Sequence, residues 1–436
     1  METILRILKK IIPQRLFNLL QAPYHYSLVL LGTIIYRFPS REIKVIGVTG
    51  TKGKTSTTEI LATILEATPN PKKAGENLKV ATSSTLQFKI GQKIDRNMYK
   101  MSMPGRFFMQ KFLRQAVSAN CDFAIIEMTS EGARTYRHKF IDLDGLIFTN
   151  ISPEHIESHG SYAKYLDAKL NFARALEKSP KSNKVLVVNG EDPESPKFLK
   201  VAPSTRQIQL TIADAEPFEL KEEGGIDFTY KGEKISTPLS GRFNIYNILN
   251  AIKMAEAQGS TIEDIRQALA NLTKIAGRLE KVVVLNSKQD FDVIVDYAHT
   301  ADSLTKAYEA FGHQRKICVL GSCGGGRDKW KRPQMGAVAD LYCSDIILTN
   351  EDPYDEDPKQ IVCDVLTGIT KHQPKTILDR REAIHEAIKM ANFGDVVFIT
   401  GKGTDPYLME AGGKKTPWSD YGVAEEELLK VLKNRE

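Results

Sequence analysis

The stretch that most constrains this chain is GVTGTKGKTSTT, which spans residues 47–58. Its first two residues end the apolar run 43–48, and an amphipathic stretch follows it. Glycines at positions 50 and 53 let the backbone fold around phosphate oxygens with successive N–H groups pointing inward, and a following helix adds its positive end. The sequence therefore predicts a buried strand, an anion-binding loop and a helix in succession.

Two side chains of this loop have the chemistry that a nucleoside triphosphate requires. Lys54 supplies a mobile ammonium for the β- and γ-phosphates, and Thr55 supplies a hydroxyl suited to Mg²⁺. The strict pattern GxxxxGK[ST] needs glycine at position 48, where valine stands, so this is a variant of the loop, and a glycine-rich turn before a helix is the plain alternative. The residues expected to surround ATP here are Gly50, Thr51, Lys52, Gly53, Lys54, Thr55 and Ser56.

Short apolar runs alternate with amphipathic stretches in the first half of the chain, which predicts a mainly parallel sheet with helices on both faces. The expected strands are 43–48, 123–127, 145–148 and 185–188, and the expected helices are 56–65, 107–118 and 162–176. Between 207 and 240 the segments become short and alternating, which indicates hairpins at the edge of that domain.

A second series of the same kind begins near Gly277 and predicts a smaller, Rossmann-like α/β domain. Its expected strands are 291–295, 317–320, 346–348 and 396–399, and its expected helices are 303–311, 381–390 and 424–432. The fold class is therefore α/β, with a P-loop central domain. The expected domains are a short apolar and basic segment at 1–42, an ATP-binding domain at 43–276 and a C-terminal domain at 277–436.

Charge and cysteine usage limit the class of partner and the compartment. The net charge of +6 suits an anionic substrate, but no basic stripe is interleaved with aromatic residues, so nucleic acid is excluded as a partner. The five cysteines form no CxxC pair, which predicts free thiols in a reducing compartment and argues against a structural zinc. We expect a cytoplasmic monomer.

The first forty residues are apolar and basic. Four apolar residues share one helical face beside three basic ones: Ile4, Ile7, Leu8 and Ile11, with Arg6, Lys9 and Lys10. A second apolar run at 26–36 is too short to cross a bilayer, where about 20 residues are needed, and no small-residue cleavage site follows it. Two interpretations stay open: the segment packs on the body of the protein, or it makes a peripheral contact with a membrane surface.

Further motifs follow the loop in a consistent order. They are EMTSEGARTYRH, TNISPEHIESHG, YLDAKLNF, GRFNIYNILNA, GRLEKV, VDYAHTADSL, GSCGGGRDKWKRPQMG, TNEDPYDEDP and GKGTDP. Together with TGTKGKTST they resemble the Mur ligases, which are ATP-dependent amide-forming enzymes of peptidoglycan synthesis, and in particular the MurE branch, which adds the third peptide residue. The resemblance runs from about residue 43 to the C-terminus, which is roughly nine-tenths of the chain.

The resemblance implies that ATP gives its γ-phosphoryl group to a carboxylate and that an amine then attacks the acyl phosphate. The implied substrates are a UDP-MurNAc-peptide or related muramyl peptide and an amino acid. The implied catalytic residues are Lys54, Glu127, His155, Lys169 and Arg278. Thr55, Glu127 and His155 are implied to hold Mg²⁺, together with Lys169 once CO₂ has carbamylated it.

The resemblance implies further contacts in both halves of the chain. The nucleotide contacts are Asn244, Asn247, Asp296, His299 and Arg327. The muramyl-peptide contacts are Ser102, Pro104, Arg106, Ser130 and Arg137. Plain structural roles stay open for several residues, namely a solvated helix lysine at 169, a helix cap or inter-domain hydrogen bond at 244 and 247, a strand-end carboxylate at 296 and a surface ion pair at 278.

Several departures from the family pattern bear on the substrates rather than on the reaction. About forty apolar and basic residues replace the full-length N-terminal domain that holds the UDP-sugar. Glu154 replaces the aspartate that precedes the metal-binding histidine. The DNPR signature for diaminopimelate reads EDPY at 351–354, so Tyr354 replaces the arginine that grips the distal carboxylate.

The amino-acid site is expected to include Asp352, Tyr354, Arg381 and Asp405. Carboxylates at Asp352 and Asp405 would pair with an ammonium, which favours a lysine-like amino acid over diaminopimelate, although surface acids explain them almost as well. Arg381 or Arg327 is the alternative partner for a second carboxylate on the substrate.

Other functions stay open beside this one. A related ligase would act on a lipid-linked muropeptide, which the apolar N-terminus favours, or on a folylpolyglutamate-type substrate. An amidotransferase subunit of the MurT kind carries a four-cysteine zinc ribbon, which these cysteines cannot build. In a plain P-loop NTPase switch, the GRFNIYN, DYAH and GKG segments have no role.

Overall fold

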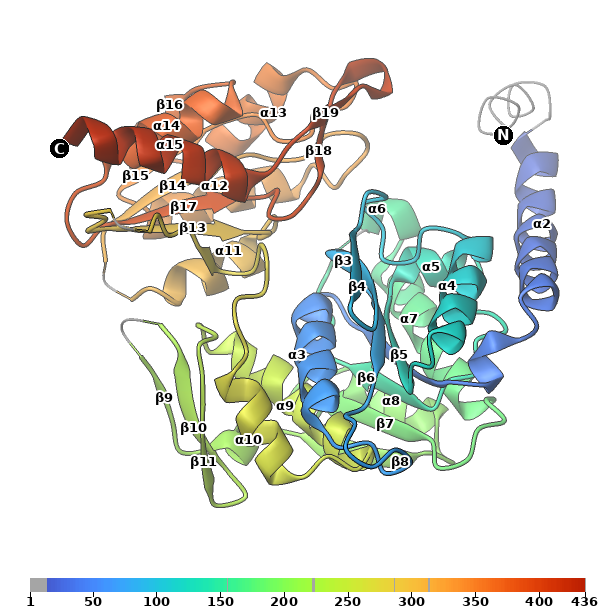
Figure 1. The fold of residues 1–436 in the computed structure, drawn as a ribbon. Helices are drawn as coiled ribbons and strands as arrows, with labels where there is room; N and C mark the ends of the chain where they lie inside the picture. The colour runs from blue at the N-terminus through green and yellow to red at the C-terminus, as the bar shows by residue number, and fades with distance from the viewer. Residues whose placement is uncertain (1–13, 155, 222–223, 286, 313, 436) are drawn as a thin grey trace. The chain divides into compact units, whose positions relative to one another are not determined.

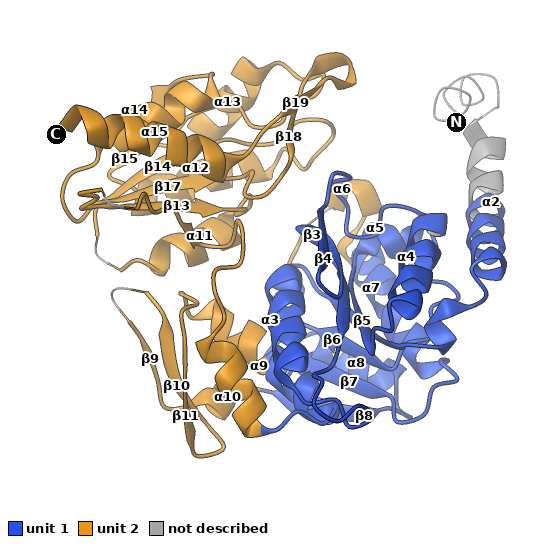
Figure 2. Ribbon diagram, viewed as in Figure 1, with its two compact units in different colours: residues 1–151, 163–210, 250–261 blue, residues 152–162, 211–249, 262–436 orange. Residues whose placement is uncertain are grey.

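The computed structural model describes residues 14–435 apart from 155, 222–223, 286 and 313. The chain forms two compact units that are not contiguous in sequence (Figure 2). Unit 1 holds residues 1–151, 163–210 and 250–261, and unit 2 holds residues 152–162, 211–249 and 262–436.

Unit 1 is built on an eight-stranded sheet with the order β4-β3-β2-β5-β1-β6-β7-β8 (Figure 1). Six of its strands run parallel, and the edge pairs β2–β3 and β3–β4 are antiparallel. The strands are β1 Lys44–Thr49, β2 Val80–Ser83, β3 Gln87–Ile90, β4 Lys93–Arg96, β5 Phe123–Met128, β6 Gly145–Phe148, β7 Val185–Asn189 and β8 Arg206–Leu210. The inner strands are continuous apolar runs because a parallel sheet is covered on both faces.

The helices of unit 1 connect these strands. They are α2 Gln14–Ile35, η1 Pro39–Arg41, α3 Lys54–Ala67, α4 Arg106–Ser118, α5 Ser130–Arg134, α7 Tyr162–Glu177 and α8 Ser195–Val201, with the second half of α9 Phe243–Ala257. Strand β1 lies between β5 and β6, so the loops that leave the carboxyl ends of these three strands emerge at one edge of the sheet. This is the edge at which open α/β sheets bind ligands.

Helix α2 packs on α4, and one arginine of α4 fixes its end. The Arg114 guanidinium donates to the carbonyl oxygens of Tyr36 and Arg37 at 3.0 and 3.1 Å, just beyond the last turn of α2. It also pairs with Glu42 at 2.5 Å. A cation placed at the carboxyl end of a helix interacts favourably with the helix dipole, so Arg114 both caps α2 and joins it to the body of unit 1.

Unit 2 contains a six-stranded sheet with the order β12-β13-β17-β14-β15-β16, which is parallel except for β12. One apolar cluster packs α14 and α15 on one face of this sheet, and a second packs α11, α12 and α13 on the other. The strands of this sheet are β12 Glu280–Lys281, β13 Asp292–Asp296, β14 Lys316–Leu320, β15 Asp345–Leu348, β16 Lys375–Thr376 and β17 Val396–Thr400. The helices are α11 Ala301–Glu309, α12 Lys331–Tyr342, α13 Pro358–Leu366, α14 Arg380–Met390 and α15 Asp420–Arg435.

Unit 2 also includes smaller elements. Strands β9 Phe218–Leu220, β10 Ile226–Tyr230 and β11 Glu233–Thr237 form an antiparallel sheet, and β18 Tyr407–Met409 pairs with β19 Lys415–Pro417. The remaining elements are α6 Ile156–His159, η2 Ile212–Ala215, α10 Ile262–Ala270 and η3 Ala411–Gly413. Across the described residues, no helix combines the length and the apolar character that a membrane span requires.

The α/β fold class is confirmed, and two details of the sequence prediction are wrong. Hairpins were expected over residues 207–240, but residues 207–210 belong to β8, the parallel edge strand of the large sheet. Free thiols were expected throughout, but Cys318 of β14 and Cys343 after α12 form a disulfide with their Cα atoms 6.1 Å apart. Because the packing of a helix on a sheet brings these two cysteines together across 25 residues of sequence, no local spacing signals the pair. Among the described residues, Cys121, Cys323 and Cys363 take part in no disulfide.

His138 is a titratable side chain in the core of unit 1. Only 3% of its surface is exposed, and its ring meets that of Phe172 edge-on at 5.2 Å. Burial, with a smaller contribution from the charge of Lys139, lowers the pKa of His138 from 6.5 to about 4. The folded chain therefore keeps this imidazole neutral at pH values at which the unfolded chain protonates it.

We predict that His138 makes the protein less stable as the pH falls from about 6.5 towards 4, because only the unfolded state binds a proton in that window. The free energy of unfolding should fall by about 2 kcal/mol between pH 7.5 and pH 5 from this group alone. In His138→Leu that part of the pH dependence should disappear, as measured by urea unfolding at the two pH values. An unchanged pH dependence in the variant would contradict the assignment.

Candidate active site

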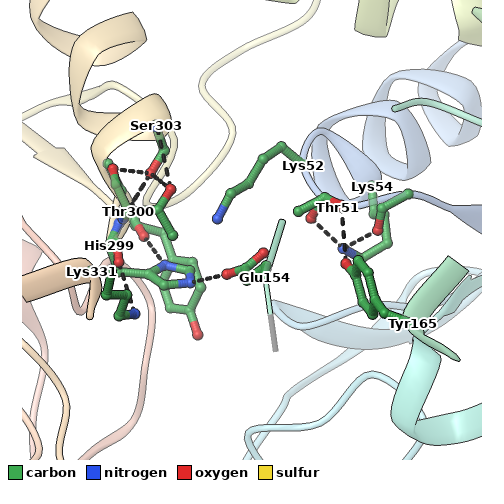
Figure 3. A network of polar contacts seen from close by, with 12 residues as sticks. Thr51, Lys52, Lys54, Glu154, Tyr165, His299, Thr300, Ser303 and Lys331 are labelled. Carbon is green, nitrogen blue, oxygen red and sulfur yellow. Dashed lines mark hydrogen bonds and ion pairs between the residues drawn. The ribbon is translucent and has the colours of Figure 1, made fainter. Parts of the chain in front are cut away.

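The loop between β1 and α3 folds around its own lysine. Gly53 precedes α3 with φ of 81°, and Thr55 and Ser56 are buried in the first turn of that helix. The Lys54 ammonium donates to the carbonyl oxygens of Gly50 at 3.0 Å and Thr51 at 2.8 Å (Figure 3). The sequence prediction of a strand, loop and helix is therefore confirmed, and the lysine lies over the loop.

Gly50 is required by the close approach of the segment that follows β6. Its φ is 152°, and a Cβ atom there would lie 1.9 Å from the Thr149 hydroxyl. Asn150 supports the loop from the same side, because its carbonyl oxygen accepts from Thr51 N–H at 2.8 Å and its side-chain oxygen accepts from Lys52 N–H at 2.9 Å. No other residue type fits position 50 without moving this support.

Helix α7 delivers Lys169 to the same loop. This side chain is 2% exposed, and its ammonium donates to the Gly50 carbonyl oxygen at 2.6 Å. The ammonium also lies 4.8 Å from the centre of the Tyr165 ring, whose hydroxyl shares a hydrogen bond of 3.0 Å with Thr51 (Figure 3). A solvated helix lysine is therefore excluded, and two ammonium groups, those of Lys54 and Lys169, meet at one carbonyl oxygen.

Glu127 and Thr55 come together through Thr85. Glu127 is the penultimate residue of β5 and is fully buried, and it accepts from the Thr85 backbone N–H at 3.3 Å. The Thr85 hydroxyl is 2.9 Å from the Thr55 hydroxyl. A hydroxyl and a carboxylate in this arrangement are oxygen ligands of the kind that Mg²⁺ binds. His155, predicted as a further metal ligand, lies outside the described residues.

Glu59 belongs to this cluster, although the sequence analysis did not single it out. It lies on α3 and accepts from the Ser84 hydroxyl at 3.2 Å and from the Gln87 amide at 3.0 Å. Burial, together with the negative charge of Glu127, raises the pKa of Glu59 to about 7. An acidic residue among the threonines and aliphatic residues of this helix was the signal available in the sequence.

The predicted muramyl-peptide residues occur in two segments of unit 1. The Ser102 carbonyl oxygen accepts from the Ser83 hydroxyl at 2.7 Å, and Pro104 follows two residues later. Ser130 begins α5 and is buried, and the Arg137 guanidinium donates to the Met103 carbonyl oxygen. These contacts join the 101–104 segment to β2 and to the residues that follow α5, while Arg106 is described only as the first residue of α4.

In unit 2, His299 is held in a defined orientation. Its Nε2 atom lies 3.0 Å from a carboxylate oxygen of Glu154, and its Nδ1 atom lies 2.7 Å from the Tyr297 carbonyl oxygen. The Lys331 ammonium donates to the backbone carbonyl oxygen of His299 at 3.0 Å (Figure 3). Glu154 therefore reaches His299 directly. The aspartate that stands here in the family pattern has a shorter side chain with which to make this contact.

Asp296 organises the start of the second α/β series. Its two carboxylate oxygens accept from the backbone N–H groups of Ala298 and Leu279, each at 2.7 Å. Arg278 directly precedes Leu279 in the sequence, and its guanidinium lies 4.7 Å from the centre of the Tyr297 ring. Both side chains have structural roles in addition to the nucleotide contacts implied for them.

The two predicted adenine contacts bind each other. The Asn247 amide donates to the Asn244 side-chain oxygen at 2.8 Å, and the Asn244 amide donates to the Ser240 carbonyl oxygen at 2.7 Å. Both residues are buried at the start of α9. Asn244 and Asn247 therefore have the plain structural role of hydrogen bonding at the start of a helix.

The acids predicted to receive an amino-acid ammonium instead surround a lysine of the chain itself. Lys402 is fully buried, and its ammonium donates to Asp352 at 2.8 Å, to Asp405 at 3.3 Å and to the Tyr407 carbonyl oxygen at 2.6 Å. Like Glu59, Lys402 was not singled out in the sequence analysis, although it is the central residue of the GKG segment.

The two arginines considered for this site differ in their surroundings. Arg381 pairs with Glu426 and Glu427 of α15, at 2.6 and 2.8 Å, and does not join the Lys402 cluster. Arg327 is exposed on the loop after β14. Tyr354 has a left-handed backbone, with φ of 52°, and its ring covers Gly325 of that loop, where a Cβ atom would lie 2.5 Å from the ring.

We predict that Lys402→Met destabilises the protein strongly, because it leaves the Asp352 carboxylate buried without its cation. Breaking a buried pair in this way costs about 3–5 kcal/mol, whereas Lys414→Met removes an exposed pair with Glu410 and should cost less than about 1 kcal/mol. Urea unfolding of both variants measures the difference. Equal, small losses would show that Lys402 is not needed to balance these acids.

Comparisons with known proteins support the family resemblance that the motifs indicate. Residues 48–255 match the Mur ligase middle domain, and residues 277–403 match the Mur ligase glutamate ligase domain. A UDP-N-acetylmuramoyl-L-alanyl-D-glutamate–2,6-diaminopimelate ligase from Syntrophomonas wolfei is 36% identical over 396 residues, covering 88% of this chain and 78% of the relative. The ligase of the same name from Geobacillus kaustophilus is 35% identical over 415 residues, covering 91% of this chain and 81% of the relative.

Solved structures extend the comparison to the fold. A ligase of that same name has a TM-score of 0.59 at 25% identity and covers 89% of this chain and 78% of its own. Folylpolyglutamate synthase of Mycobacterium tuberculosis, complexed with ADP, has a TM-score of 0.68 at 16% identity, with coverages of 87% and 92%, and shows the fold alone. The chain therefore belongs to the Mur ligase family of ATP-dependent ligases.

Proposed function

We propose that this chain joins an amino acid, as the third residue, to a muramyl peptide in the cytoplasm, with ATP as the energy source. The observation that carries the proposal is the meeting of Lys54 and Lys169 at the Gly50 carbonyl oxygen. Two like charges at one site repel each other, so the site gains stability when anionic oxygens enter it. The phosphates of ATP supply such oxygens, and the loop is of the kind that binds them.

The chemistry requires charge neutralisation more than it requires proton transfer. A carboxylate oxygen is a poor leaving group, so the γ-phosphoryl group of ATP is transferred to it first, and the amine of the amino acid then displaces phosphate from the acyl phosphate. The transfer gathers anionic oxygens, which Lys54 stabilises by position and charge. Thr55 and Glu127 would hold Mg²⁺, with His155 at a second ion, and the metal would supply further neutralisation.

Lys169 fits the carbamylated lysine of the family. CO₂ adds to the neutral amine with formation of an N–C bond and release of a proton, which places a carboxylate at the end of a long side chain. The burial of Lys169 and its 2.6 Å contact with the loop locate that end beside the phosphate site. The carbamate would replace one of two repelling cations by an anion and would offer Mg²⁺ another oxygen ligand.

Unit 2 supplies the remaining groups of the proposal. Asp296 is assigned to the ribose, Asn244 and Asn247 to the adenine, and Arg278 to the phosphates. His299, oriented by Glu154, and Arg327 are assigned to the nucleotide as well. For the asparagines this requires that the mutual hydrogen bond leaves amide groups available for adenine, since each side-chain amide has two N–H donors and one oxygen.

The proposed ligation is tested by phosphate release with UDP-MurNAc-L-Ala-D-Glu, ATP, Mg²⁺ and a panel of amino acids. Phosphate release that needs both the peptide and one amino acid supports the function. Lys54→Ala should lose at least about 100-fold in kcat, as expected when a key electrostatic contact is removed. The exposed Lys139→Ala serves as the control and should retain activity. Release without either substrate would identify an NTPase instead.

We predict that Lys169→Ala is nearly inactive and is partly rescued by formate or acetate, because a small carboxylate can replace the carbamate as metal ligand. Lys54→Ala is the matched control, since its missing group is a cation, and carboxylates should not rescue it. Initial rates with and without added carboxylate measure both. The carbamate role is wrong if acetate has no effect on Lys169→Ala or restores both variants equally.

The amino acid proposed for this site is lysine, or another residue that ends in an amine. The relatives cited above are named for 2,6-diaminopimelate, whose second carboxylate calls for a fixed cation, and Tyr354 stands where an arginine would supply it. Lys402 balances only one of the two carboxylates, Asp352 and Asp405, so the cluster keeps a formal negative charge. That charge attracts an ammonium and repels a carboxylate.

We predict a kcat/KM for lysine about 10- to 150-fold above that for meso-diaminopimelate, since a lost bidentate contact corresponds to about 1.5–3 kcal/mol. Tyr354→Arg should shift the ratio towards diaminopimelate, and Tyr354→Phe should leave it unchanged. A clear preference of the unmodified protein for diaminopimelate would overturn this assignment and would point to Arg327 as the cation.

A further inference from the structure

Helix α2 has an apolar face on each side, and no described residue covers one of them. Val29, Gly32 and Thr33 are buried towards α4, and a Cβ atom at Gly32 would lie 3.4 Å from the Phe107 ring. On the other side, four large side chains follow the i, i+7, i+10, i+11 spacing of a single helical face. They are Tyr24, Leu31, Ile34 and Ile35, exposed by 42%, 48%, 54% and 54%. We call these four residues the outer face of α2.

The sequence around this helix is strongly basic. Residues 1–41 contain one acidic residue, Glu2, and six basic ones: Arg6, Lys9, Lys10, Arg15, Arg37 and Arg41. Arg37 and Arg41 are exposed near the end of α2. An apolar helical face accompanied by basic residues is complementary to a surface that is apolar inside and anionic outside.

We propose that the outer face of α2 docks on an anionic lipid surface and holds the ligase at a membrane. The helix would lie in the headgroup region, with Leu31, Ile34 and Ile35 inserted among the acyl chains and the exposed Arg37 and Arg41 at the phosphates. This differs from crossing the bilayer, for which no helix among the described residues is suited. The inference goes beyond the proposed ligase function, which requires no membrane.

Charge distinguishes an anionic lipid surface from a second copy of the chain as the partner of the outer face. Pairing two outer faces would bury the same aliphatic side chains, but it would also bring together two basic segments with six cationic residues each. Like charges at such an interface repel, whereas anionic headgroups neutralise them. An anionic lipid surface is therefore the partner that both the apolar and the basic residues favour.

The test is flotation of the full chain with vesicles of phosphatidylcholine alone and with added phosphatidylglycerol. The protein should float with the anionic vesicles, less with the neutral ones, and less at high salt. The variant Leu31→Gln, Ile34→Gln, Ile35→Gln changes no charge and keeps good helix formers, and its bound fraction should fall at least tenfold. The double variant Ile34→Gln, Ile35→Gln is a milder form, to be used if the triple variant unfolds.

The matched control replaces three exposed apolar residues of unit 2 by glutamine, namely Leu285, Leu341 and Phe393. It should bind anionic vesicles as the unmodified chain does, and both variants should retain turnover of the soluble substrate. No flotation with anionic vesicles, or equal loss in both variants, would overturn the proposal. So would a dimer in light scattering that the α2 variant dissociates, because the outer face would then belong to a second copy. If the proposed ligase function were wrong instead, turnover would be absent while flotation with anionic vesicles persisted.

Discussion

The carbonyl oxygen of Gly50 is the point on which the catalytic half of the molecule depends. Two lysine ammonium groups donate to it, one from the loop itself and one from α7. The glycine is required because Thr149 leaves no space for a side chain. A strand, a loop and two helices therefore converge on one polar atom, and the convergence concentrates positive charge where the proposed reaction gathers negative charge.

Unit 2 shows the opposite arrangement of charge, because acidic side chains there surround a single lysine. Lys402 lies between Asp352 and Asp405, donates to both and balances the charge of one, so the surroundings of the proposed amino-acid site are fixed before any substrate arrives. Buried Glu351 next to this group has its pKa raised, because burial and the neighbouring Asp352 both disfavour its charge. In the proposed function, amino-acid specificity depends both on the charge that this cluster retains and on the residue at position 354, where tyrosine replaces arginine.

The sequence predicted those parts of the molecule whose signal is local. The strand before Gly50 and the helix after it form one continuous pattern, and so do the inner strands of both sheets. The pairing of β8 with β7 depends on neighbours in space, and residues 206–210, which are mostly exposed, do not show the apolar run of a covered strand. Cys318 and Cys343, likewise, are related by packing and not by spacing.

For the site, the same distinction separates what could be predicted from what could not. Lys54 and Lys169 were found because motifs place them, and the structure brings them to one atom. Lys402 and Glu59 were missed because their roles depend on which acids surround them, and burial decides this only after the fold has formed. Arg381 was expected in the amino-acid site, but the two glutamates of α15 hold it elsewhere, a competition that no motif reveals.

The cap that Arg114 places on α2 has a consequence for the way this chain can be shortened. A truncation that begins after residue 38 would look harmless in an alignment, because the motifs start later. It would remove the carbonyl oxygens to which the guanidinium donates and would uncover Phe107 on the first turn of α4. Designers of a minimal catalytic fragment should therefore treat this helix as part of the enzyme body and not as a detachable leader.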